Sequence, residues 1–336
     1  MKRALVIATI CLGAAAFLIW LVSLDVLFNQ LSAVAVIIAR SSPTPLQVLS
    51  ACLPSALISF HGFKTRKFTF AATLLSFVSG VLLLSSGLKY FCSVLAFYVA
   101  KSSLILYIWR RKLYSGGSHQ AHHPYPPLDV WRILVKGFAP ALISTFKLVL
   151  IRYNSSSVTC TDCRIADVAF LSYVACCAGH GFSTELAAVR FAKPKLITTW
   201  RNVMPGVRGG VTILSTIASA VGGGFIGVVF FFVLTVLPGH EQPILDNSNC
   251  YQYYIVLGML AGMLGSCFGS LLGATLKYSG IDPVTNKVVR HANGGSIEHV
   301  TGIDLLDDTQ IALVASSLTS ASFAAVAWLK FSYSLH

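Results

Sequence analysis

Long apolar segments alternate with short polar segments along almost the whole chain. Each apolar segment holds about 20 residues, the length at which a helix crosses roughly 30 Å of hydrocarbon. An open strand edge is not stable in lipid, so each segment is expected to be a helix. The pattern predicts an all-α integral membrane protein, a polytopic bundle of nine transmembrane helices. The predicted spans are residues 4–23, 44–61, 68–88, 90–109, 133–151, 166–189, 209–238, 251–276 and 309–332.

Composition excludes a water-soluble domain. Of the 336 residues, 55% are hydrophobic and only 11% are charged, with a mean hydropathy of +0.73, whereas soluble domains carry about 25% charged residues. The net charge of +13 would suggest nucleic acid as the partner of a soluble protein. Here the basic residues stand in short clusters beside apolar spans, which is a signal of membrane orientation. We therefore predict the lipid bilayer as a partner and no nucleic acid.

The basic residues are unequally divided between the two predicted faces. Cytosolic segments usually carry the excess of Lys and Arg. Only five lie on one face, namely Arg40, Lys89, Arg152, Arg164 and Lys330. With the N-terminus in the cytosol, the cytosolic segments hold 18 of the 25: Lys2, Arg3, Lys64, Arg66, Lys67, Arg110, Arg111, Lys112, Arg132, Lys136, Arg190, Lys193, Lys195, Arg201, Arg208, Lys277, Lys287 and Arg290. We therefore predict a cytosolic N-terminus and an odd number of helices.

The segment 152–165 is predicted to face away from the cytosol. Its sequence Asn154-Ser155-Ser156 is an acceptor for N-glycosylation, a modification of that face. Cys160 and Cys163 in the same segment are expected to form a local disulfide or to remain two thiols, since no second pair completes a zinc site. These features suit a lumenal or an extracellular loop. We expect an endomembrane, the endoplasmic reticulum, in preference to the plasma membrane. The apolar N-terminal run is expected to be a retained span rather than a cleaved signal peptide.

Glycines recur four residues apart within the spans. Gly223 and Gly227 form one such pair, and Gly258 and Gly262 form another. Small residues at this spacing let helix backbones approach closely, so we expect them at helix contacts. The run Gly222-Gly223-Gly224 is also compatible with a break in its helix.

Glu185 stands near the predicted cytosolic end of the sixth span. A carboxylate at membrane depth is costly unless it faces a polar cavity or pairs with a cation. Both alternatives, a functional cavity and a pair with Arg or Lys, remain open from the sequence.

Two further polar segments lie on the predicted cytosolic face. In the first, hydroxyls, an arginine and two glycines precede span seven, where a helix N-terminus would favour phosphate, although a plain junction between loop and helix fits equally well. Its residues are Thr198, Thr199, Arg208, Gly209 and Gly210. In the second, Asp307 and Asp308 precede span nine, where they would hold Mg²⁺ or cap the last helix. Capping is the interpretation that the sequence favours.

These segments together resemble the transmembrane protein 19 family, also described as domain of unknown function 92. Its relatives include the plant phytyl-phosphate kinase. The resemblance covers a membrane domain at 61–336, whereas the helices of 1–60 match poorly. It implies a CTP-dependent kinase of isoprenoid monophosphates, with Mg²⁺ and CTP as cofactors. The matching stretches are Lys195-Leu196-Ile197-Thr198-Thr199-Trp200, Gly209-Gly210-Val211-Thr212, Leu272-Gly273-Ala274-Thr275 with Tyr278 and Gly280, and His299 through Leu306-Asp307 to Ser316-Ser317.

The resemblance also assigns roles to residues. It implies catalytic roles for Glu185, Asp307 and Asp308. The phosphate contacts that it implies are Thr198, Thr199, Arg208, Gly209, Gly210, Thr275 and Lys136.

Several polar positions of the family pattern are altered. The aspartate of G-D-T-[WY]-A-[ST]-E is His180, the aspartate of D-S-x-L-G-A-T is Gly269, and the last asparagine of L-D-N-x-x-V-N is Ala312. Two amides of the pattern are replaced by Arg208 and Lys136. Because a phosphotransferase that loses two metal carboxylates loses most of its stabilisation of the transferring phosphoryl group, we expect a diverged member without catalysis.

Three hypotheses follow from the sequence. In the first, the chain is a catalytically silent relative that still binds an isoprenoid or lipid phosphate. In the second, it is an active lipid-phosphate phosphotransferase with a metal site rebuilt from Glu185, Asp307 and Asp308. In the third, many spans and glycine-rich helices make it a transporter or a membrane scaffold. The sequence predicts no particular protein partner.

Overall fold

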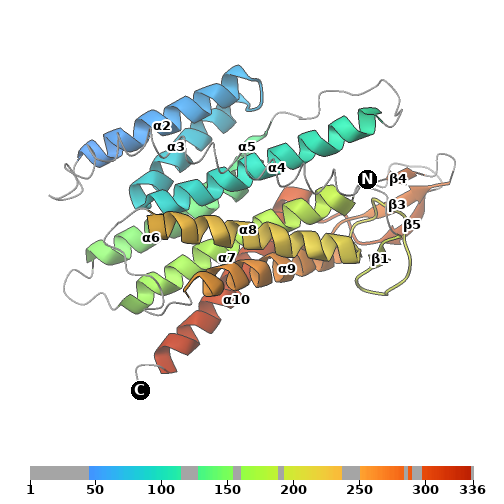
Figure 1. The fold of residues 1–336 in the computed structure, drawn as a ribbon. Coiled ribbons are helices and arrows are strands. Elements are labelled where there is room, and N and C mark those ends of the chain that lie inside the picture. Colours follow the sequence, from blue (N-terminus) through green and yellow to red (C-terminus); the bar gives the residue numbers. More distant parts are fainter. Residues whose placement is uncertain are drawn as a thin grey trace, which may run out of the picture. The chain divides into compact units, whose positions relative to one another are not determined.

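The computed structural model describes residues 45–114, 128–153, 160–187, 193–236, 250–283, 287–289 and 297–333. The chain forms two compact units, Met1–Pro54 and Ser55–His336. The described residues are mostly helical (Figure 1). The predicted fold class of helical integral membrane protein is thereby confirmed in its coarse form.

Helices occupy the positions of eight predicted spans. The span at 4–23 lies outside the described residues, so the number nine and the orientation stay predictions. Among the described residues, five helices, α4, α7, α8, α9 and α10, are long and apolar enough to cross a membrane. The helical elements are α2 (Pro45–Lys64), α3 (Phe70–Ser86), α4 (Leu88–Tyr114), α5 (Val130–Ile133), the π-helix η1 (Leu134–Phe138), α6 (Ala139–Tyr153), α7 (Cys160–Ala187), α8 (Ile213–Val236), α9 (Cys250–Leu276) and α10 (Asp308–Tyr333).

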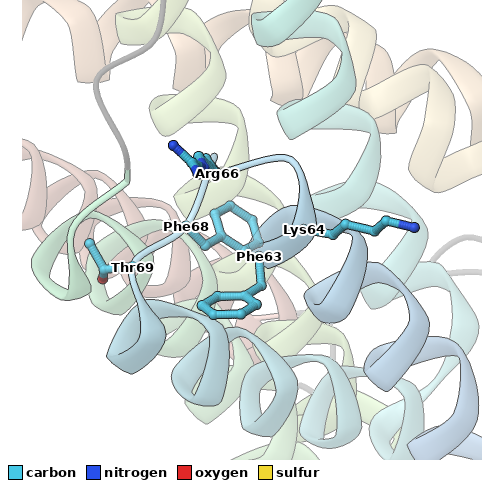
Figure 2. A pocket seen from close by; sticks show the side chains of 5 residues that line it. All are labelled: Phe63, Lys64, Arg66, Phe68 and Thr69. Carbon is cyan, nitrogen blue, oxygen red and sulfur yellow. The ribbon is translucent and has the colours of Figure 1, made fainter.

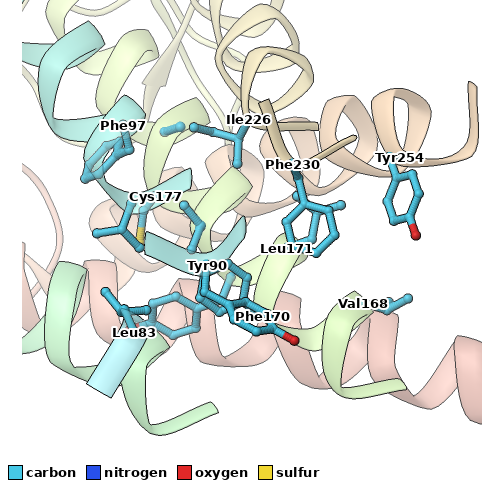
Figure 3. Packing of buried hydrophobic residues seen from close by; sticks show 14 of the residues in the cluster. Leu83, Tyr90, Phe97, Val168, Phe170, Leu171, Cys177, Ile226, Phe230 and Tyr254 are labelled. Carbon is cyan, nitrogen blue, oxygen red and sulfur yellow. The ribbon is translucent and has the colours of Figure 1, made fainter. Parts of the chain in front are cut away.

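Helix α7 occupies the centre of the second unit. It packs against α4, α6, α8, α9 and α10, and 78% of the residues in its most apolar stretch are buried. Figure 3 shows the aromatic core around it, in which the Tyr90 ring meets the Phe170 ring edge to face at 4.7 Å and Phe230 lies 5.4 Å from Tyr254. Such pairs add to the burial of apolar surface, so this core holds the surrounding helices in fixed positions.

The glycine spacing marks the contact between α8 and α9, as the sequence predicted. A Cβ atom on Gly223 would lie 2.1 Å from the carbonyl oxygen of Gly258, and one on Gly262 would lie 2.4 Å from the carbonyl oxygen of Ser219. The two backbones therefore touch directly. Helix α8 runs without interruption from Ile213 to Val236, so Gly222-Gly223-Gly224 is a packing surface and not a break.

Helix α8 begins four residues later than the predicted span. The hydroxyl of Thr212 accepts from the backbone N–H of Ser215, and the hydroxyl of Ser215 accepts from that of Thr212, both at 3.0 Å. This reciprocal cap satisfies the first turn of the helix. Gly209 and Gly210 therefore precede the helix and are not part of its first turn, which corrects the predicted start of the span. The anion site at this helix end stays a prediction.

Two small antiparallel sheets, which sequence analysis did not predict, follow the helix ends. Strand β1 (Lys195–Leu196) pairs with β2 (Gly210–Val211). The second sheet has the order β4-β3-β5, with β3 (Ser279–Asp282) between β4 (Lys287–Val289) and β5 (Glu298–Thr301). Leu196, Val207 and Ala274 form a small core with Val288 and Val300. The described parts of the segments 193–212 and 277–308 thus lie together.

Candidate functional site

Seven charged or titratable side chains from widely separated segments gather at one end of the second unit. We call this group the polar cluster. It contains four cations, one histidine and two carboxylates, so positive charge is in excess. The helices contribute Lys101 of α4, Lys136 of η1, His180 and Glu185 of α7, and Asp308 of α10, and the segments between helices contribute Arg208 and Lys277. Five of them are site residues that sequence analysis named.

The first part of the polar cluster joins α4, η1 and α7. The Nζ atom of Lys101 lies 3.9 Å from Oε1 of Glu185, so of the two alternatives left open for this carboxylate the structure contains the pair with a cation. The Lys136 ammonium lies beside that of Lys101. Two neighbouring ammonium groups therefore share the surroundings of one paired carboxylate, an arrangement that attracts a further anion.

Lys136 stands in a π-helical segment. Residues Leu134–Phe138 form η1, and the hydroxyl of Tyr173 donates to the carbonyl of Val135 there at 2.8 Å. Single π-helical turns occur frequently at functional sites because they re-aim a side chain within a helix. Here the irregular turn carries the cation that replaces the asparagine of the family pattern.

The second part of the polar cluster joins the 207–209 segment to α10. Oδ2 of Asp308 accepts from the Arg208 guanidinium at 2.5 Å, and Oδ1 lies 3.0 Å from the ammonium of the buried Lys277. The Arg208 backbone N–H donates to the hydroxyl of Ser279 at 3.2 Å. Both carboxylate oxygens of Asp308 thus face cations, and one positive charge remains in excess.

His180 and Gly269, two altered positions of the family pattern, lie against each other. A Cβ atom on Gly269 would lie 2.8 Å from Nδ1 and 2.9 Å from Cε1 of the His180 ring. The imidazole therefore fills the space into which a side chain at 269 would project. Its Nδ1 atom is buried and has no hydrogen-bond partner among the described residues. Such an atom costs about 1–3 kcal/mol unless water or a ligand satisfies it.

The glycine-rich segment before α8 touches α9 beside these residues. Gly209 has φ +79°, and a Cβ atom there would lie 2.4 Å from Cβ of Ala274. Only glycine permits both the left-handed backbone and the close approach. The Ile197 N–H donates to the Gly209 carbonyl at 2.9 Å, so the turn with Thr198 and Thr199 begins next to this segment. Both threonines are exposed there.

The remaining predicted residues have local roles. The Thr275 hydroxyl donates within its own helix, to the Leu271 carbonyl at 2.9 Å. The Asp307 carbonyl accepts from the Ile311 N–H, and its own N–H donates to the side chain of Gln310, as in a helix cap. The carbonyl of Ala312 accepts from the Ser316 hydroxyl at 2.7 Å.

Metal ligands do not gather at the polar cluster. Within the described part of the chain, no group of three or more His, Cys, Asp or Glu side chains is arranged to hold a metal ion. Glu185, Asp307 and Asp308 therefore do not form such a group. Asn154 lies outside the described residues, as does the side chain of Cys160, so the glycosylation and the disulfide stay predictions.

A second charged group, which sequence analysis missed, is buried among α4, α6 and α7. The Asp167 carboxylate lies 3.0 Å from the Lys89 ammonium and 3.2 Å from that of Lys147, and it accepts from the Tyr90 hydroxyl. The lysine and aspartate side chains are each less than 10% exposed. The sequence held a signal for this group, since Asp167 and Lys147 lie inside two predicted spans. Unpaired charges at membrane depth are costly, so both residues need partners.

Comparison with known proteins identifies a family and two relatives. Residues 53–320 match the integral membrane protein family DUF92. Protein PGR of Arabidopsis thaliana is 26% identical over 287 residues, which cover 82% of this chain and 94% of the plant protein. An uncharacterized membrane protein of Methanocaldococcus jannaschii is 27% identical over 114 residues, 34% of this chain and 42% of the archaeal one. No solved structure matches this chain.

Proposed function

The chain belongs to the integral membrane protein family DUF92, and from that premise we propose that it is a multi-pass protein that binds an isoprenoid or lipid phosphate without transferring a phosphoryl group. The excess of positive charge in the polar cluster is the observation that carries the proposal. Within the polar cluster, four cations, Lys101, Lys136, Arg208 and Lys277, stand against two carboxylates, those of Glu185 and Asp308. A phosphate monoester would balance this excess.

The geometry at His180 supports the absence of phosphoryl transfer. Kinases of this kind neutralise the transferring group with Mg²⁺ held by carboxylates. Where the family pattern has two aspartates, this chain has an imidazole packed on Gly269. The unsatisfied Nδ1 atom of His180 supports a polar occupant next to the ring. We infer that cations of the protein replace the metal as the partner of the phosphate.

The proposal includes the membrane arrangement. A bundle of nine helices with a cytosolic N-terminus in the endoplasmic reticulum would put the polar cluster on the cytosolic side, where phosphorylated intermediates and nucleotides are found. The basic residues of the predicted cytosolic segments support this orientation.

Lys136→Gln is expected to weaken the binding of a prenyl monophosphate roughly ten-fold, the effect of losing one charged contact. Equilibrium dialysis of the purified protein with radiolabelled phytyl monophosphate measures this change. Lys195→Gln removes the same charge from the exposed strand β1 and serves as the control, which should bind as the wild type does. Equal weakening in both variants, or none in either, would contradict the proposal.

The same preparation is expected to show no phosphorylation of prenyl monophosphates when CTP and Mg²⁺ are added. The physical reason is the loss of two metal carboxylates at His180 and Gly269. Turnover that Glu185→Gln abolishes would instead support an active phosphotransferase rebuilt around Glu185, Asp307 and Asp308. A transporter or scaffold would show neither turnover nor the dependence on Lys136.

Restoring the aspartates of the family pattern should reveal the coupling between the two altered positions. Gly269→Asp alone is expected to destabilise the protein by about 1–3 kcal/mol, because its Cβ atom collides with the His180 ring. With His180→Asp added, the ring is gone and stability should largely return, with Mg²⁺-dependent nucleotide binding as the gained property. Thermal unfolding and calorimetric titration measure the two effects. Additive destabilisation in the double variant would show that the positions are not coupled.

A further inference from the structure

A hollow on the surface of the second unit lies at the turn between α2 and α3, in a different part of the chain from the polar cluster. It is lined by Phe63, Lys64, Arg66, Phe68 and Thr69. Figure 2 shows the rings of Phe63 and Phe68, which line the hollow, near each other, with the side chains of Lys64 and Arg66 extending in different directions. The hollow therefore combines aromatic walls with two cations.

The turn is held in one conformation. The Lys67 and Phe68 backbone N–H groups both donate to the Gly62 carbonyl, at 2.9 and 3.3 Å. A Cβ atom on Gly62 would lie 2.4 Å from the Phe68 ring, so that ring rests directly on the helix backbone. Arg66 has φ +53°, a conformation that few side chains adopt without a stabilising context. The backbone thus fixes the points from which the side chains of Lys64 and Arg66 extend.

The surroundings of the hollow are mostly apolar and carry more basic than acidic side chains. One exposed carboxylate, Asp129, follows Leu128, whose carbonyl accepts from the Thr69 N–H. Phe60 is 63% exposed and Phe70 is 68% exposed, and Phe63 packs edge to face on Phe70 at 6.3 Å. No Asp or Glu occurs in the sequence between Asp25 and Asp129. Exposed aromatic side chains next to cations are typical of the interface between hydrocarbon and headgroups.

We propose that this hollow binds the headgroup of an anionic phospholipid. The phosphate and any further anionic group of the lipid would contact the Lys64 ammonium and the Arg66 guanidinium, and its chains would lie along Phe60, Phe63 and Phe70. Charge complementarity selects an anionic lipid over a zwitterionic one, and the apolar walls select a lipid over free phosphate. The predicted orientation puts the turn in the cytosolic leaflet, where anionic lipids are enriched.

Native mass spectrometry of the detergent-solubilised protein tests the proposal. Phosphatidylserine and phosphatidylcholine are titrated separately, and inorganic phosphate is added as a competitor. The test variant is Lys64→Gln with Arg66→Asn, because asparagine tolerates the left-handed backbone at 66 while removing the charge. The control is Lys195→Gln with Arg201→Gln, which removes the same number of exposed cations from the β1 segment.

The wild type is expected to bind phosphatidylserine more tightly than phosphatidylcholine. The test variant should bind phosphatidylserine about 20-fold more weakly, from two cations at an anionic surface, and the control should keep wild-type affinity. Equal binding of the two lipids, equal losses in both variants, or displacement by millimolar phosphate would each overturn the proposal. An unchanged elution profile and helical circular dichroism of the variants exclude misfolding as the cause of a loss.

Discussion

Asp167→Asn is expected to be the most destabilising single substitution in the membrane core, at about 3–5 kcal/mol. The carboxylate lies between the ammonium groups of Lys89 and Lys147 and accepts from the Tyr90 hydroxyl. The asparagine side chain has the same shape but leaves two buried ammonium groups without their counter-charge. In an interior that water does not reach, that loss is not screened.

Unfolding of the purified protein in detergent, followed by circular dichroism, measures this effect. Asp129→Asn is the matched control, since Asp129 is exposed and its side chain makes no capping hydrogen bond. A second variant separates charge from packing. With Lys89→Met, Asp167→Leu and Lys147→Met together, most of the stability should return, because the apolar side chains replace the whole charged group. If Asp167→Asn were no more harmful than Asp129→Asn, the carboxylate would not hold these helices together.

Gly223→Ala is expected to disrupt the contact between α8 and α9, at a cost of about 3 kcal/mol or more. The added methyl group would lie 2.1 Å from the Gly258 carbonyl oxygen and 2.9 Å from Cα of Gly262. Both obstacles are backbone atoms, so neither can move without shifting a whole helix. The variant should unfold at lower denaturant concentration and give less folded protein on purification.

Gly224→Ala provides the comparison at the next residue of the same helix. Its Cβ atom would meet the Cγ atom of Met259 at 2.8 Å, part of a flexible side chain that can adopt another rotamer. Alanine also favours the helix over glycine by about 1 kcal/mol. We therefore expect stability within about 1 kcal/mol of the wild type. Similar losses at 223 and 224 would show that helix propensity, and not the contact between backbones, decides the outcome.

Sequence reasoning found most members of the polar cluster but not their arrangement. Glu185, Arg208 and Asp308 stood out as polar residues beside long apolar runs, and His180 and Lys136 stood out as altered positions of the family pattern. Their partners did not. Lys101 lies inside a predicted span, and this signal was not used, whereas Lys277 resembles other basic residues at the ends of spans. The sequence pattern also could not predict the contact between His180 and Gly269, because these residues belong to different helices.

The start of α8 is another feature that the sequence predicted only approximately. Apolar periodicity continues through Gly209 and Gly210, so the sequence predicts a span that includes them. The pairing of Gly210 with Leu196 and the cap between Thr212 and Ser215 begin the helix at Ile213 instead. Pairing with a strand from a distant segment is a tertiary interaction, and short strands leave little trace in composition.

The sequence by itself determined that this is a helical membrane protein and where most of its spans lie. The physical reason is that lipid requires every backbone polar group of a long apolar segment to be satisfied within that segment, so length and composition suffice. Only the tertiary structure decided which charges meet. A side chain at membrane depth takes its counter-charge from whichever helix packs beside it, and Asp167 finds Lys89 and Lys147 on two different neighbours.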